Sequence, residues 1–82
     1  MSIMVLDEQP GQVNLTGPIP RNKLIDMYRY MRNNFSDYEV EIDSEKSFTD
    51  PKLNFIEMSI SYDIDDEKHF QKSLKMFKMV WG

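Results

Sequence analysis

The sequence contains no cysteine and a single histidine, His69. These shortages exclude disulfide bonds, thiolate metal sites and clusters of imidazole ligands. No apolar run approaches the ~20 residues that a membrane-spanning helix needs. The apolar opening Met1–Leu6 has no basic lead and reaches Asp7 too soon for a secretory signal. We therefore expect a soluble, cytoplasmic protein with no cofactor and no membrane partner.

The chain is short and its charges are unevenly distributed. Its 82 residues fit one domain, 1–82, which buries only about 60–65% of the unfolded surface and is marginally stable. Residues 37–67 contain 11 acids and two lysines, a local balance of -9. The rest of the chain carries eight basic and three acidic residues, a balance of +5, and the two parts recover the net charge of -4. We expect acidic strands and basic helices.

Two stretches alternate with the period of two that is typical of half-buried strands. In Leu53–Ile64 one face carries Ile56, Met58, Ile60, Tyr62 and Ile64, and the other carries Phe55, Glu57, Ser59, Ser61 and Asp63. The shorter stretch Tyr38–Asp43 repeats this pattern, with Tyr38, Val40 and Ile42 opposite Glu39, Glu41 and Asp43. We expect these strands to pair across the polar loop Ser44–Lys52, which is long for a hairpin. Either the strands extend into that loop or the loop has a role of its own.

The N-terminal part contains two short β-prone pieces, Ile3–Asp7 and Gln12–Thr16. Pro10 followed by Gly11 between them suits the centre of a type II turn. The segment Gly17–Pro20 is predicted to end any strand, because proline donates no hydrogen bond to a ladder. Residues 1–19 are therefore expected to form a hairpin or an extended arm.

Helical spacing predicts two helices. In 21–35 the predicted buried stripe is Leu24, Tyr28, Met31 and Phe35, widened by Ile25 and Met27. A second helix follows Ile64 with Asp65 as its expected N-cap, and its buried stripe is Phe70, Leu74, Phe77 and Trp81. Lys68, Lys72, Lys75 and Lys78 lie on its other sides. The prediction is a small two-layer α+β domain of ββαββα order, with an antiparallel sheet and two helices packed on one face.

No motif supports metal binding or catalysis. The run 63–67 resembles the start of a calcium loop, but Lys68 replaces the glycine at the sixth position and Leu74 replaces the acid at the twelfth. Carboxylates that work as an acid and base pair need a pocket, whereas the acids of 39–43 alternate along an exposed strand. His69 at the start of a helix is typical of a surface residue. We expect no enzyme activity.

The acidic outer face of the two central strands is the main functional candidate. We interpret the chain as a small acidic protein-interaction module, a blocking or regulatory protein that binds a basic surface of a larger partner. A nucleic-acid-binding protein would fit as that partner. The predicted partner-binding residues are Glu39, Glu41, Asp43, Phe55, Glu57 and Asp63. Phe55 would be the aromatic anchor.

Other interpretations stay open. The acidic face could only keep the chain in solution, and Phe55 could pack beneath the loop against Phe48. The seven methionines suit adaptable packing, so the chain could be a structural subunit of a homo-oligomer or a larger assembly. Direct nucleic-acid binding through the basic helices is disfavoured by a pI of about 4.8.

Overall fold

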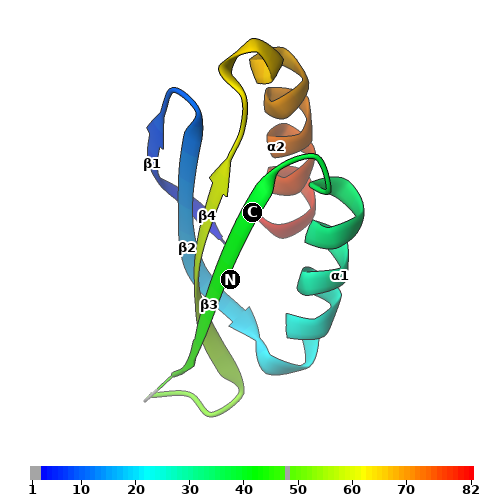
Figure 1. Cartoon of the computed structure of the whole chain (residues 1–82). Coiled ribbons are helices and arrows are strands. Elements are labelled where there is room, and N and C mark those ends of the chain that lie inside the picture. Colours follow the sequence, from blue (N-terminus) through cyan, green and yellow to red (C-terminus); the bar gives the residue numbers. More distant parts are fainter. Residues whose placement is uncertain (1–2, 48) are drawn as a thin grey trace.

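The computed structural model describes residues 3–47 and 49–82. In chain order the elements are β1 (Met4–Gln9), β2 (Gln12–Pro20), the 3-10 turn η1 (Arg21–Lys23), α1 (Leu24–Asn34), β3 (Glu39–Lys46), β4 (Leu53–Ser61), the 3-10 turn η2 (Ile64–Asp66) and α2 (Glu67–Trp81). The strands form one antiparallel sheet in the order β1-β2-β4-β3. Both helices cover the same face of this sheet (Figure 1). The predicted α+β fold and its ββαββα order are confirmed.

The core lies between the sheet and the two helices. Phe70 and Phe77 of α2 are fully buried, and their ring centroids lie 6.3 and 6.2 Å from that of Phe35. Burial of such a side chain is worth about 1.5–3 kcal/mol relative to its exposure. The predicted α2 stripe is confirmed, with Trp81 packed at the margin of the core. The fully or nearly fully buried apolar residues are Ile3, Val13, Leu15, Ile19, Met27, Met31, Phe35, Ile56, Met58, Ile60, Phe70, Leu74 and Phe77.

β1 and β2 form a full hairpin of the sheet and not an arm. Gly11 has φ +85°, the left-handed value that the third position of a type II turn requires, so the predicted turn is confirmed. The predicted strand break at Gly17–Pro20 is wrong, because β2 pairs with β4 as far as Pro20 opposite Leu53.

Backbone geometry explains how β2 accommodates its prolines. The N–H of Arg21 donates to the carbonyl oxygen of Lys52 at 2.8 Å, so at this position the N–H points toward the β4 side. N–H directions alternate along a strand, so the nitrogens of Pro18 and Pro20 point away from β4. On that side β1 pairs with β2 only as far as Thr16. Neither proline removes a donor that the ladder uses.

The first helix is rotated relative to its predicted stripe. Its buried residues are Met27 and Met31, whereas Ile25 is 65% exposed and Tyr28 is 40% exposed. On the opposite flank Tyr30 packs toward α2, with its ring centroid 6.0 Å from that of Phe77. The apolar pattern allowed either flank to be buried, and the position of α2 beside α1 decides which one is.

The step from β4 to α2 also differs from the prediction. The strand ends at Ser61, and Ile64 is 60% exposed instead of lying on the core face. The expected N-cap Asp65 makes no cap; Asp63 accepts a hydrogen bond from the backbone N–H of Asp65 at 3.0 Å and caps η2. A short 3-10 turn therefore precedes the helix.

Candidate functional site

The face of the sheet opposite the helices is open and acidic. Strand register places Glu39, Glu41, Asp43 and Glu45 of β3 beside Ser61, Ser59, Glu57 and Phe55 of β4, and these lie beside Gln12, Asn14, Thr16 and Pro18 of β2. We call these 12 outward positions the acidic face. Among these described positions none is lysine or arginine, because the alternation of β3 and β4 puts only acids, serines and Phe55 outward.

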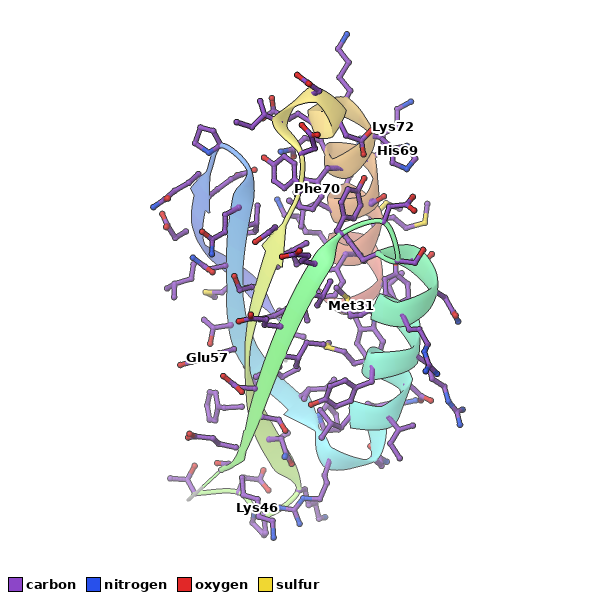
Figure 2. The ribbon with its side chains drawn as sticks, viewed as in Figure 1. Met31, Lys46, Glu57, His69, Phe70 and Lys72 are labelled. Atoms are coloured by element: carbon purple, nitrogen blue, oxygen red, sulfur yellow. The ribbon has the colours of Figure 1, made fainter. Side chains whose placement is uncertain are left out.

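Glu57 lies at the centre of the negative charge. It pairs directly with Asp43, and the register places Glu41 and Glu45 at the two diagonal positions. In Figure 2 the side chain of Glu57 points away from the helices, whereas Met31 and Phe70 point into the layer between helices and sheet. Like charges directly opposite in a sheet cost roughly 0.2–1 kcal/mol. This arrangement therefore lowers the stability of the free domain.

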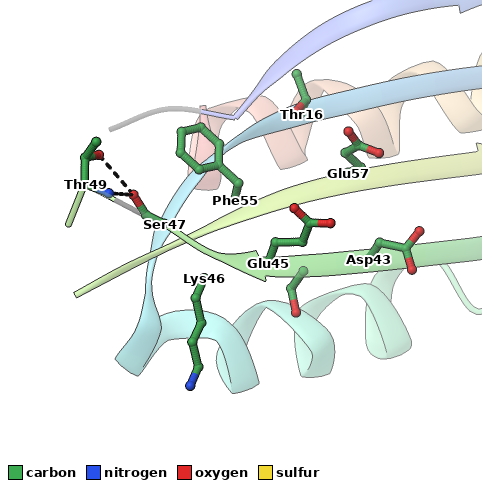
Figure 3. A pocket seen from close by; sticks show the side chains of 9 residues that line it. Thr16, Asp43, Glu45, Lys46, Ser47, Thr49, Phe55 and Glu57 are labelled. Carbon is green, nitrogen blue, oxygen red and sulfur yellow. Dashed lines mark hydrogen bonds between the residues drawn. The ribbon is translucent and has the colours of Figure 1, made fainter. Parts of the chain in front are cut away.

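Two shallow hollows adjoin on this face. The larger, of about 540 Å³, lies at the end of the sheet near the β3–β4 loop and is lined by Thr16, Glu45 and Phe55, among others (Figure 3). The smaller, of about 250 Å³, is lined by residues that include Leu6 and Asn14. Asp43 and Glu57 line both hollows. The acidic pair thus sits where the two depressions meet.

Phe55 is the large apolar side chain of the larger hollow and is 50% exposed. It pairs with Glu45 on β3 and with Pro18 on β2. Figure 3 shows its ring between the loop residues and the carboxylates. The alternative was that Phe55 packs against Phe48, and Phe48 lies outside the residues that the structure describes. A half-exposed aromatic ring surrounded by acids is suited to an apolar contact within a charged interface.

Side-chain hydrogen bonds organise the two ends of the face. Gln12 Nε2 donates to Ser59 Oγ at 2.9 Å and links β2 to β4. At the loop end, Ser47 Oγ accepts from the backbone N–H groups of Thr49 at 3.3 Å and Asp50 at 3.2 Å. Such bonds hold a turn by its own polar side chains. β3 reaches Lys46, so the extension of a strand into the predicted loop is confirmed for β3.

Five of the six predicted partner-binding residues lie together on this face: Glu39, Glu41, Asp43, Phe55 and Glu57. Asp63 does not, because β4 ends at Ser61 and the Asp63 carboxylate caps η2. The prediction missed Glu45, although continuing the alternation by two residues would have found it. It also missed Asn14 and Thr16, because nothing in the sequence indicates that β2 lies beside β4.

In residues 3–47 and 49–82, no group of three or more histidine or acidic side chains is arranged to hold a metal ion. In the same ranges no helix is long and apolar enough to cross a membrane.

Burial, followed by a 2.9 Å hydrogen bond to Asp66 Oδ2, raises the pKa of Tyr38 from 10.0 to about 12. Burial also raises the pKa of Tyr30. Both phenols pack against the core and not on the acidic face.

The fold and this surface define the class of the protein as a small two-layer α+β domain with an open acidic sheet face. No protein-family model, curated protein or solved structure matches the chain. The residues of the acidic face are therefore the basis for inferring its function.

Proposed function

We propose that this chain is a protein-interaction module that binds a basic surface of a larger protein through its acidic face. The observation that carries the proposal is the register, which aligns five carboxylates and Phe55 on one open face without a cation among them. Complementary charge steers association and selects the partner. Phe55 supplies the apolar contact that charge alone does not.

The mechanism is occlusion, so the chain acts as a blocking or regulatory protein. A rigid sheet presents its carboxylates in fixed positions, and covering a basic surface with them excludes other anionic ligands. A surface that binds phosphate groups has this chemistry, which makes a nucleic-acid-binding protein a fitting partner. The like-charge pair of Asp43 on β3 and Glu57 on β4 supports this proposal, because it lowers the stability of the free domain and is relieved by a cationic partner.

The test is affinity capture from the native host's lysate with a matched pair of variants. One removes three charges from the acidic face, Glu39→Gln, Glu41→Gln and Asp43→Ser, and we call it the acidic-face variant. The other, Lys68→Ser, Lys72→Ser and Lys75→Ser, removes three charges from exposed positions of α2. The wild type and the lysine variant should retain a basic partner that the acidic-face variant loses.

A binding measurement on the purified partner completes the test. Its affinity for the wild type should fall as ionic strength rises, because salt screens the charges. If the acidic-face variant keeps the partner at wild-type affinity, the proposal is wrong and the acidic face only solvates the domain. Circular dichroism of each variant establishes that it is folded before capture.

Exposed apolar residues on α2 favour a second candidate, a structural subunit of a homo-oligomer or assembly. Met76, Met79 and Val80 are 57%, 78% and 55% exposed. Packing of these side chains against a second copy would bury them. Light scattering over a concentration series separates the candidates, since an assembly subunit associates with itself and a blocking module stays monomeric until its partner is added.

A further inference from the structure

The free edge of the sheet at β3 is a second distinctive feature of the molecule. β3 and β1 are the outer strands. The ladder of β1 is interrupted by a bulge between Val5 and Asp7, whereas β3 pairs with β4 in unbroken register from Glu39 to Lys46. Proteins commonly protect edge strands with bulges, prolines, short length or charged side chains. β3 has a regular ladder, no proline and eight residues, so of these devices it carries only charged side chains.

The backbone of β3 offers hydrogen-bonding groups along this edge. The N–H of Ser47 donates to the carbonyl oxygen of Leu53 at 3.1 Å and so points toward β4. Because these directions alternate along an antiparallel ladder, the backbone N–H and C=O groups of residues 39, 41, 43 and 45 also point toward β4. Val40, Ile42 and Ser44 therefore direct their N–H and C=O groups outward. An added strand would pair with these three residues.

A groove accompanies the edge on the helix side of the sheet. It has a volume of about 470 Å³, and its lining includes Tyr28 and Met31 of α1 and Val40 and Ile42 of β3. Val40 and Ile42 are only half-buried although they face the core side. Tyr28, which was expected in the core, instead lies 40% exposed beside this groove. Arg32 and Ser36 also line the groove, so it is a mixed surface with an apolar part at Val40 and Ile42, next to the free edge.

The charge of the acidic face disfavours a second copy of this chain at the edge. Antiparallel pairing of two β3 strands centred on Ile42 would place Glu41 opposite Asp43 of the second copy. The same pairing would place Glu39 opposite Glu45. Every outward pair would then join two carboxylates, which is destabilising. A strand with basic outward residues would instead form opposite-charge pairs at the same positions.

We propose that β3 accepts a β-strand from the partner, in which apolar and basic residues alternate. Partner residues opposite Val40 and Ile42 place apolar side chains in the groove. Partner residues opposite Glu39, Glu41 and Asp43 place lysine or arginine on the acidic face. The main-chain bonds supply affinity and the two sets of side chains supply specificity, as in other complexes formed by strand addition. This inference rests on the proposed function, because it specifies how a basic partner is held.

The test uses synthetic peptides as the probe. The first peptide is a heptapeptide with an acetylated N-terminus and an amidated C-terminus, in which lysine and valine alternate. The control peptide has the same composition and the same termini, but its lysines stand together in one block and its valines in another. Titration by NMR should show the alternating peptide binding at least about tenfold more tightly, and only this peptide should slow amide hydrogen exchange at Val40, Ile42 and Ser44. Equal affinity of the two peptides, without such protection, would overturn the inference.

A variant isolates the edge from the charge. In Ser44→Pro the outward N–H is removed, while the bonds to β4 and all acidic side chains are kept, as with the prolines of β2. It should weaken binding of the alternating peptide by about tenfold or more. If Ser44→Pro binds like the wild type while the acidic-face variant does not, strand addition is wrong and the proposed function stands. If the acidic-face variant binds both the peptide and the captured partner like the wild type, the proposed function itself fails. Should Ser44→Pro not fold, amide exchange in the wild type decides.

Discussion

Glu57→Gln should stabilise the domain, because Glu57 lies at the centre of the acidic face. The register gives it one direct carboxylate neighbour, Asp43, and two diagonal ones, Glu41 and Glu45. Cross-strand neighbours lie about 5 Å apart when opposite and about 7–8 Å apart on the diagonal. With the dielectric constant of water and 0.1 M salt, the direct repulsion is about 0.5 kcal/mol and each diagonal one about 0.25 kcal/mol. Glu57→Gln should therefore raise the unfolding free energy by about 1 kcal/mol.

Salt and a matched control distinguish this local effect from a change in net charge. In 1 M salt the screening length is about 3 Å, so the gain should shrink to about a quarter of its value. Glu67→Gln removes the same charge from the first turn of α2. It should lower stability by about 0.3–1 kcal/mol, because a negative charge there favours the helix dipole.

Urea denaturation, followed by the fluorescence of the single tryptophan, Trp81, measures the unfolding free energy of the wild type and both variants. Urea is uncharged, so the denaturant itself does not change the ionic strength. Equal gains for Glu57→Gln and Glu67→Gln would show that net charge and not the register is responsible. A gain for Glu57→Gln that does not change with salt would refute the electrostatic account altogether.

Two further predictions concern the core. Trp81 packs at the margin of the core with its ring centroid 6.1 Å from that of Tyr30, so Trp81→Ala should lower the unfolding free energy by about 3 kcal/mol. Thermal unfolding followed by circular dichroism, also on a chain that stops at Met79, checks this, and wild-type stability of either chain would contradict it. The pKa of Tyr38 is raised from 10.0 to about 12, so its neutral form contributes stability that is full below about pH 10 and lost as the pH rises through 12. Tyr38→Phe should therefore lose stability less steeply than the wild type between pH 10 and 12 in urea titrations, and identical slopes would exclude this role of the phenol.

The acidic face shows which parts of a site can be predicted from sequence alone. Alternation predicted that Glu39, Glu41, Asp43, Phe55 and Glu57 share one face, because side-chain direction in a strand has a fixed period of two. The sequence indicates less clearly at which residue a strand ends. Asp63 was assigned to the face although its carboxylate caps η2, and Glu45 was left out although β3 continues past it.

Local periodicity by itself determined the fold class, the two central strands and the buried stripe of α2. These features depend on residues close in sequence, whose geometry a single strand or helix fixes. The tertiary structure decided what depends on distant neighbours. It placed β2 beside β4. The prolines of β2 remove no hydrogen bond from the ladder, because their nitrogens face the side on which β1 no longer pairs with β2. It also placed α2 against the Tyr30 flank of α1, which left Tyr28 beside an open groove at the edge of β3.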